Sequence, residues 1–291
     1  MPGLALRPIL ASERDSLAWW IDHAPFAHIH VGWLTPARWV GRPVSLQMAD
    51  RHDRTQAALL ACPDALQVAW VQGFACSRKL APPEAWHTLW EAAREALIAL
   101  GVSRVWAMSS EPPFAAMLQS AGFRRTSEVV TLTYLGEGTS LPPPPPGVSL
   151  RAMNALDLPA ILALDNASFQ APWQMDREAL ETTFAASAIG TVAMSQEHVV
   201  GYLLATQSQG RLHLARLATA PAWQRRGIGR ALTCHLLQHA RPPAVDNLTV
   251  NTQVENSASL QLYRALGFHE GGRGVPVYGL DLPPTSGTAQ A

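Results

Sequence analysis

Hydrophobic and polar positions along the second half of the chain predict strands and helices in turn. Short runs in which apolar and polar side chains alternate are typical of half-buried strands, and stretches with apolar residues every three or four positions are typical of amphipathic helices. The predicted helices cover 156–164, 176–185, 227–239 and 257–266. The predicted strands cover 191–195, 199–207, 212–219, 246–251 and 275–282. This alternation indicates an α/β fold with a mixed sheet flanked by helices.

The end of the first half has the same pattern as the end of the second half. A strand at 103–108, a helix at 113–120 and a strand at 128–135 are predicted there. In both halves Gly-Phe follows the helix, at Gly122-Phe123 and at Gly267-Phe268. Glycine suits the left-handed position after a helix, and the apolar residue after it can fold back on the last turn. The shared pattern indicates an internal repeat of about 140 residues.

A proline run separates the two halves. The segment 141–147 reads Leu-Pro-Pro-Pro-Pro-Pro-Gly, and consecutive prolines favour the stiff polyproline II conformation. The expected organisation is therefore a first domain at 1–140, a linker at 141–147 and a second domain at 148–291, with a disordered tail at 283–291.

Composition limits the classes of function. The chain has 291 residues, of which 48% are hydrophobic and 15% charged, and its formal net charge is zero. No broad positive field therefore favours nucleic acid or an anionic membrane. The most apolar stretch, 57–76, is interrupted by proline and polar residues, and the N-terminus lacks the apolar core of a signal peptide. Three cysteines without C-x-x-C spacing are typical of reduced thiols, so a cytoplasmic protein is expected.

One segment has the chemistry of a phosphate-binding loop, Gln224-Arg225-Arg226-Gly227-Ile228-Gly229-Arg230. It follows a predicted strand and opens a predicted helix, whose first backbone N–H groups have no partner within the helix. These N–H groups and the positive end of the helix dipole attract a pyrophosphate. The two glycines let a ligand approach the backbone, and the arginines add positive charge. A glycine turn before an ordinary helix is the alternative, and the segment matches neither the P-loop nor the dinucleotide-binding motif.

Two motifs together resemble the GCN5-related N-acetyltransferase (GNAT) superfamily. The first is the family's Q/R-x-x-G-x-G/A, present at Gln224–Gly229. The second is an asparagine-led helix followed by L-Y-x-x-x-G-F, present at Asn256–Phe268. The resemblance covers roughly 148–282. It implies two tandem GNAT-like domains, each a mixed, splayed β-sheet flanked by helices, and an acyltransferase that takes acetyl-CoA as its acyl donor.

The resemblance assigns roles to particular residues. In the family, acetyl-CoA lies where two neighbouring strands splay apart. Its pantetheine arm pairs with the first of these strands, its pyrophosphate binds backbone amides of the loop, and the asparagine contacts the arm. The corresponding cofactor-binding residues are Leu217, Ala218, Thr219, Arg225, Arg226, Gly227, Ile228, Gly229, Arg230 and Asn256.

The family's tyrosine, which points at the thioester sulfur, corresponds to Tyr263. It follows Asn256 by seven residues, about two helical turns, so both lie on one helix face. A tyrosine hydroxyl, with a reference pKa near 10, is matched to a thiol leaving group and can act as general acid. Packing over the helix is the alternative role for this side chain.

The attacking amine must lose a proton, so a general base or a water chain is expected. Some relatives carry a catalytic glutamate at the position of His213. Histidine titrates near neutrality and can serve there, although a structural role in the strand is equally compatible with the sequence.

Two segments are similar to the ribosomal-protein alanine N-acetyltransferases, Phe169–Trp173 and Trp223–Gly227. Those enzymes place a basic glutamate five residues before the helix asparagine, where this chain has Asn251, which cannot accept a proton at neutral pH. This departure argues against a peptide N-terminus as the acceptor and leaves small-molecule amines open. The expected acceptor is a primary amine, of a small molecule or of a peptide N-terminus, and the sequence does not identify it.

The first half has no Gly-x-Gly sequence within residues 1–140. When the halves are aligned on Gly-Phe, Leu118 replaces Tyr263 and Glu111 replaces Asn256, while Pro82 and Glu84 replace the loop glycines. The first half is therefore predicted to keep the fold and to lack the cofactor site. No metal site is predicted, because the histidines at 28 and 30 have no cysteine or carboxylate at ligand spacing.

Two functions follow as hypotheses. The first is an N-acetyltransferase in which the amine attacks the thioester directly within a ternary complex. The second is a non-catalytic acyl-CoA-binding or regulatory module that retains the cofactor site.

Overall fold

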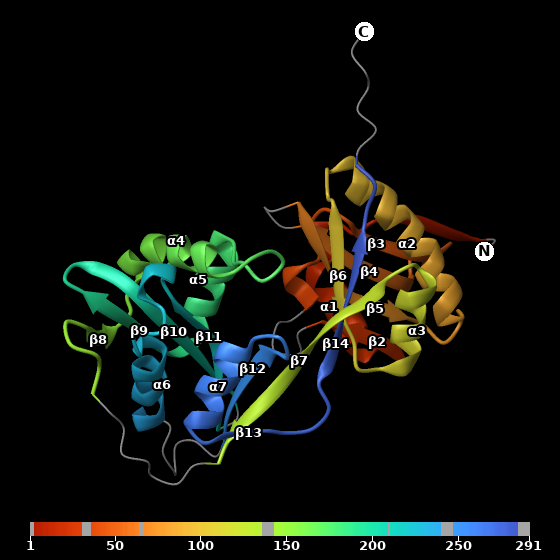
Figure 1. The fold of residues 1–291 in the computed structure, drawn as a ribbon. Helices are drawn as coiled ribbons and strands as arrows, with labels where there is room; N and C mark the ends of the chain where they lie inside the picture. Colours follow the sequence, from red (N-terminus) through yellow and green to blue (C-terminus); the bar gives the residue numbers. More distant parts are fainter. Residues whose placement is uncertain are drawn as a thin grey trace. The chain divides into compact units, whose positions relative to one another are not determined.

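The computed structural model of the chain describes residues 3–30, 36–63, 67–135, 143–208, 210–239 and 247–284. Its contacts divide the chain into two compact units, coloured from red to blue along the sequence in Figure 1. Unit 1 comprises Met1–Ser127 and Val275–Ala291, and unit 2 comprises Glu128–Gly274. The first part of the predicted linker and most of the predicted disordered tail lie outside the described residues. None of the described helices is long and apolar enough to span a membrane.

Unit 1 is a mixed sheet with helices on both faces. Its sheet has the order β1-β3-β4-β5-β6-β14, and β2 pairs with β5. The strands are β1 Leu4–Pro8, β2 Phe26–Ile29, β3 Ser45–Asp50, β4 Thr55–Pro63, β5 Val68–Cys76, β6 Arg104–Met108 and β14 Val275–Asp281. The helices are α1 Arg14–His23, α2 Pro82–Ala99 and α3 Pro112–Ser120. Along β4, Leu59 packs with α2 and α3 whereas Leu60 packs with α1, as the two-residue period of a strand requires.

Unit 2 has the same layers. Its sheet has the order β8-β9-β10-β11-β12-β7, and β13 pairs with β7. The strands are β7 Arg124–Tyr134, β8 Ser149–Ala152, β9 Ser187–Ser195, β10 His198–Ser208, β11 Arg211–Thr219, β12 Asn247–Gln253 and β13 Phe268–Glu270. The helices are α4 Leu158–Ser168, α5 Arg177–Ala185, α6 Ile228–His239 and α7 Ser257–Ala265. Along β10, Leu203 packs with α6 and α7, and Leu204 packs with α4. The expected fold class is confirmed.

The final strands of the two sequence halves are exchanged. β7 comes from the first half, and it pairs antiparallel with β12, from Thr133 opposite Thr249 to Val129 opposite Gln253. β14 is the last strand of the chain, and it pairs antiparallel with β6 in unit 1. The contacts therefore divide the chain differently from the expected 1–140 and 148–291. A hydrophobic pattern identifies a strand, but it does not identify the strand's neighbour.

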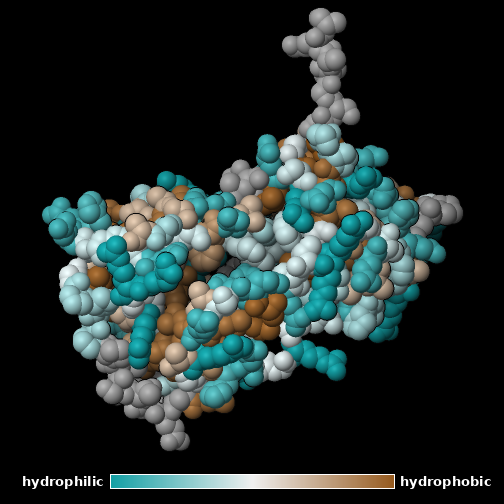
Figure 2. Space-filling view, viewed as in Figure 1, coloured by the Kyte–Doolittle hydropathy of each residue, from teal (hydrophilic) through white to brown (hydrophobic). Residues whose placement is uncertain are grey.

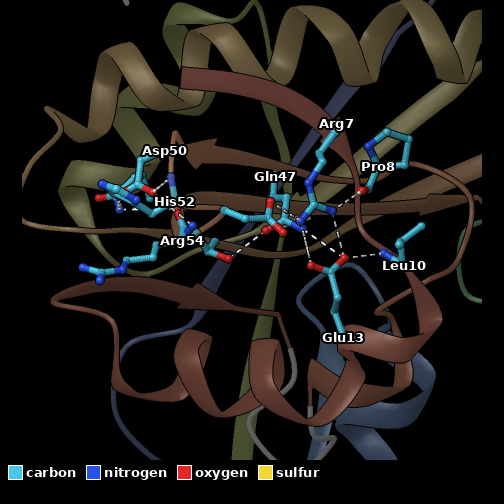
Figure 3. Close-up of polar contacts among 11 residues, drawn as sticks. Arg7, Pro8, Leu10, Glu13, Gln47, Asp50, His52 and Arg54 are labelled. Carbon is cyan, nitrogen blue, oxygen red and sulfur yellow. Dashed lines mark hydrogen bonds and ion pairs between the residues drawn. The ribbon is translucent and has the colours of Figure 1, made fainter. Parts of the chain in front are cut away.

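Details of the local structure repeat between the units. In unit 1, Arg7 pairs with Glu13 at 2.9 Å, and Glu13 accepts a hydrogen bond from the backbone N–H of Leu10, as Figure 3 shows. In unit 2, Arg151 pairs with Asp157 at 2.7 Å at the same sequence spacing, and Asp157 accepts from the backbone of Asn154. The central hairpin also has a bulge in each unit, between β4 and β5 and between β10 and β11. The internal repeat is confirmed at this level of detail.

Candidate functional site

β11 and β12 of unit 2 splay apart part of the way along their length. They pair in parallel from Arg211 opposite Asn247 to Leu214 opposite Val250. β11 then continues to Thr219 with β10 as its partner on the other edge, and β12 continues to Gln253 with β7 as its partner. Within the described residues, no strand pairs with the β12-facing edge of β11 beyond Leu214. The backbone of residues 217–219 therefore offers hydrogen-bonding groups to an extended ligand.

The glycine loop leads from the end of β11 into α6. Arg225 and Gly227 adopt left-handed backbone conformations, with φ of +59° and +83°. α6 begins at Ile228, and the N–H of Ala231 bonds the carbonyl of Gly227 at 2.9 Å, so the first turn of the helix starts within the loop. A residue with a side chain would be strained at Gly227, which explains why glycine stands there.

The splayed edge and the loop line one cleft of about 420 Å³. Figure 2 shows apolar surface between α6 and α7, the helices that carry part of this lining. The lining residues are Ser168, Phe169, Leu217, Ala218, Thr219, Gln224, Arg225, Gly227, Ile228, Gly229, Arg230, Asn256, Ala258, Ser259 and Leu262. Residues from β11, the loop, α6 and α7 that the sequence assigned to one site therefore lie together.

Arg226 differs from the other predicted cofactor residues, because it does not line the cleft. Its guanidinium lies over the ring of Trp223, 4.8 Å from the ring centroid. The side chain therefore packs on Trp223, and only the backbone N–H and the positive charge of Arg226 would be available to an anion at the loop.

Gly229 shows how closely the loop could approach a ligand. A Cβ added there would lie 3.5 Å from the side chain of Leu262 and 3.8 Å from the hydroxyl of Thr219, which are ordinary contact distances. The fold itself therefore has room for a small side chain at this position. Because both neighbours line the cleft, that side chain would occupy the cavity next to the N-terminus of α6, where the backbone N–H groups favour an anion.

Asn256 opens α7 and lines the cleft. Its side-chain oxygen accepts a hydrogen bond from the N–H of Ser259 at 3.1 Å, the geometry of a helix N-cap. Tyr263 is on the same helix but is only 4% exposed, and its ring packs against Phe268 at 5.5 Å. Tyr263 is not among the residues that line the cleft, and burial raises the pKa of its hydroxyl. Its catalytic role stays a prediction.

His213 and Asn251 each bond to a neighbouring threonine. The Nδ1 atom of His213 lies 2.9 Å from the hydroxyl of Thr249, opposite it on β12, and burial lowers the pKa of the imidazole. The hydroxyl of Thr131 donates to the side-chain oxygen of Asn251 at 2.8 Å. Thr131 comes from the first sequence half through the exchanged strand β7.

Sequence reasoning missed the residues that hold the Phe169–Trp173 segment. Arg216 on β11 forms an ion pair with Asp165 of α4, and it also donates to the backbone carbonyl of Trp173 at 2.6 Å. The available signal was Asp165 as the one charged residue of the apolar helix Leu158–Ser168, together with Arg216 between apolar neighbours in the strand Arg211–Thr219. Buried charges of this kind are seldom retained without a partner.

The equivalent splay in unit 1 is filled by the chain itself. β5 and β6 pair in parallel only from Val68 to Trp70. Beyond that point β2 pairs with the same stretch of β5, from Ile29 opposite Gly73 to Phe26 opposite Cys76. In addition, α2 begins with Pro82 and Pro83, which have no N–H groups to offer an anion. Among its described residues, unit 1 therefore has neither the unpaired strand edge nor the free N–H groups at a helix start that line the cleft of unit 2.

Acid should destabilise unit 1 because β2, the strand that pairs with β5 beyond the stretch paired with β6, carries a buried histidine. His28 of β2 is 6% exposed and stacks on Phe114, and among the described residues its Nε2 has no hydrogen-bond partner. Burial lowers the pKa of His28 to about 3 and that of His30 to about 4. An unfolded histidine binds a proton near pH 6.5, so the free energy of unfolding falls as the pH drops below 6.5 and stops falling near the folded pKa values. The expected slope is about 1.4 kcal/mol per pH unit for each histidine.

Urea unfolding between pH 7 and pH 4 measures this slope. His28→Phe should reduce it, whereas replacement of the exposed His23 by glutamine should leave it unchanged. If the unfolding free energy changed equally with pH in His28→Phe and in the wild type, His28 would not be a source of the acid destabilisation.

No group of three or more histidine, cysteine or acidic side chains in the described parts of the chain is arranged to hold a metal ion. His28 is buried and His30 is half-buried in unit 1. In unit 2, His235 and His239 lie with their ring centroids 4.6 Å apart on α6.

Comparison with known proteins finds a family match in unit 2. Residues 158–268 match the protein-family model described as Acetyltransferase (GNAT) family. The bS18-alanine N-acetyltransferase of Escherichia coli strain K12 is 25% identical over 126 residues, which is 42% of this chain and 81% of that protein. The mycothiol acetyltransferase of Gordonia bronchialis is 28% identical over 187 residues, 58% of this chain and 60% of that protein.

Solved structures resemble the chain over nearly its whole length. A tandem GNAT protein from the clavulanic acid biosynthesis pathway aligns with a TM-score of 0.66 at 16% identity, covering 97% of this chain and all of that one. A GCN5-related N-acetyltransferase from Sphaerobacter thermophilus aligns with a TM-score of 0.65 at 14% identity, covering 97% and 96%. These likenesses confirm the tandem GNAT fold.

Proposed function

Because residues 158–268 belong to the GNAT acetyltransferase family, we propose that this acyltransferase moves an acetyl group from acetyl-CoA to a primary amine. The observation that carries the proposal is the cleft of unit 2, where the free edge of β11 and the glycine loop line one cavity. A strand edge and a helix N-terminus are the backbone features that suit an extended arm ending in a pyrophosphate.

In this proposal the donor is held mainly by backbone groups. The pyrophosphate accepts hydrogen bonds from the amides of residues 225–230, and the arm extends along residues 217–219. Asn256 lies at the opposite wall of the cleft, on α7. Arg225 and Arg230 line the same cleft and add positive charge beside the phosphates.

The transfer step is direct attack of the amine on the thioester carbonyl, with both substrates bound. A nitrogen–carbon bond forms and the carbon–sulfur bond breaks, so the amine releases one proton and the leaving thiolate gains one. We assign the proton that the thiolate gains to the hydroxyl of Tyr263, which takes up a proton from solvent after the transfer. A tyrosine hydroxyl is protonated at neutral pH, as a general acid must be. Burial raises the pKa of this hydroxyl further above that of the thiol, which weakens it as a proton donor.

His213 is the candidate acceptor for the amine's proton. Burial lowers the pKa of the imidazole, so the ring is neutral at pH 7. If Nδ1 carries the ring proton and donates to the hydroxyl of Thr249, Nε2 keeps its lone pair. The alternative position, Asn251, holds an amide that cannot take up a proton, and this amide accepts a bond from Thr131.

For the acceptor we propose a small-molecule amine. The Escherichia coli relative is named for an alanine of ribosomal protein bS18, and the Gordonia relative is named for mycothiol. The resemblance to the alanine N-acetyltransferases implies a glutamate where this chain has Asn251, so the chain departs from the peptide-acetylating pattern at a proposed catalytic position.

A thiol-release assay with acetyl-CoA tests this function on aminosugars, polyamines, free amino acids and peptides with an N-terminal alanine. We expect thiol release matched by acetylated product for at least one small amine, at a rate at least 10-fold above that of the peptides. Tight binding of acetyl-CoA without turnover on any amine would instead favour the second hypothesis, a non-catalytic acyl-CoA-binding or regulatory module. The observation that supports this alternative is Asn251, which stands where the alanine N-acetyltransferases have a basic glutamate.

A further inference from the structure

An ion pair between Asp165 and Arg216 is buried in unit 2. The Asp165 side chain is inaccessible and that of Arg216 is 13% exposed. Nε and Nη2 of Arg216 donate to the two carboxylate oxygens at 2.7 and 2.8 Å, and the hydroxyl of Tyr202 donates to the same carboxylate. A two-point contact of this kind fixes the plane of the guanidinium as well as its position.

The fixed guanidinium holds the segment 169–175 that follows α4. Arg216 donates to the carbonyl of Trp173 at 2.6 Å, and Asp165 accepts from the N–H of Met175 at 3.0 Å. The guanidinium carbon also lies 3.7 Å from the centroid of the Phe169 ring, a cation–π contact. The ring of Phe169 is therefore held by a group that is itself anchored at several points.

Phe169 lines the cleft on the side of α4, whose last residue is Ser168. Along β11 the lining runs from Thr219, next to the loop, to Leu217. Arg216 is the next residue beyond Leu217, away from the loop, and its guanidinium contacts the Phe169 ring. The hydroxyl of Ser168 donates to the carbonyl of Thr219 at 3.2 Å, which ties the end of α4 to the strand. If the phosphates lie at the loop, the acyl group lies near Phe169.

We propose that Phe169, held by the positioning residue Arg216, forms the end wall of the cleft and restricts the acyl group to a short chain. The inference rests on the proposed function and adds the basis of its acyl-chain selectivity. Because the ring is anchored, it cannot move aside for a longer chain. Removal of the ring should open apolar space in which each buried methylene improves affinity by about fourfold.

Calorimetric titration with acetyl-CoA and butyryl-CoA measures the ratio of the two affinities without knowledge of the amine. The wild type should prefer acetyl-CoA. Phe169→Ala should shift the ratio towards butyryl-CoA by about 10-fold, since two methylenes gain space. Phe169→Leu keeps an apolar side chain and should shift the ratio in the same direction by less.

Arg216→Lys keeps the charge but loses the two-point contact, and it should shift the ratio in the same direction. Arg151→Gln is the matched control, because it breaks another strand-to-helix ion pair of unit 2, with Asp157, and Arg151 does not line the cleft. It should leave the ratio unchanged. If Phe169→Ala and Phe169→Leu both fold and keep the wild-type ratio of acetyl-CoA to butyryl-CoA affinity, the inference is overturned. Failure of the wild type to bind either acyl-CoA would overturn the proposed function itself.

Discussion

Replacement of Tyr263 by phenylalanine should lower kcat by about 10²- to 10⁴-fold and leave the affinity for acetyl-CoA nearly unchanged. The substitution removes a hydroxyl and keeps the ring that packs against Phe268, so the core of unit 2 is preserved. The lost step is protonation of the leaving thiolate. Steady-state thiol release, together with a binding titration, measures the two effects separately.

Tyr134→Phe is a matched control for this experiment. The Tyr134 ring also contacts Phe268, with centroids 5.3 Å apart, but it is on β7 and does not line the cleft. Its variant should keep the wild-type kcat. A wild-type kcat in Tyr263→Phe would remove this residue from the proposed mechanism.

Gly229→Val should weaken acetyl-CoA binding by about 100-fold or more. The new side chain would fill the part of the cleft beside the helix N-terminus, between Thr219 and Leu262, and would hold the phosphates away from the backbone amides. Each hydrogen bond to a charged group contributes about 1.5–3 kcal/mol, so the loss of two gives an effect of at least this size. The melting temperature should not fall, because valine is at least as favourable as glycine within a helix.

Gly229→Ala provides the graded control. A methyl group meets only ordinary contacts there, and the family signature allows alanine at this position, so the affinity should stay close to that of the wild type. Gly227 is less suitable for the test. Its φ of +83° would strain any side chain, so loss of binding could come from the loop rather than from the ligand.

The sequence predicted the local elements well because their signals are local. Helices predicted at 176–185 and 257–266 are observed at Arg177–Ala185 and Ser257–Ala265. Gly122 and Gly267 take the expected left-handed conformation, with φ of +91° and +87°. The predicted cofactor-binding residues, apart from Arg226, line one cleft because the two motifs lie at the ends of elements that the fold brings together.

The pairing of strands that are far apart in the sequence could not be predicted in the same way. β2 fills the splay of unit 1 and β7 completes the sheet of unit 2, and both depend on which strand edges meet rather than on hydrophobic period. The first half was expected to lack the cofactor site because it has no glycine loop. The filled strand edge gives a second, independent reason for that expectation.

The Asp165–Arg216 pair also escaped prediction. Asp165 is the one charged residue of its helix and Arg216 lies between apolar neighbours in its strand, and a single sequence does not reveal that they meet. The segment Phe169–Trp173 was recognised by its resemblance, whereas its anchoring required the distances within unit 2.

One titration tests the central claim most directly, that unit 2 holds acetyl-CoA in the cleft between the splayed edge and the glycine loop. Acetyl-CoA is titrated into the full-length wild type and into Gly229→Val, and the heat of binding is measured. We predict one binding site per chain in the wild type and its loss in Gly229→Val. Two sites per chain, or wild-type affinity in Gly229→Val, would contradict the claim.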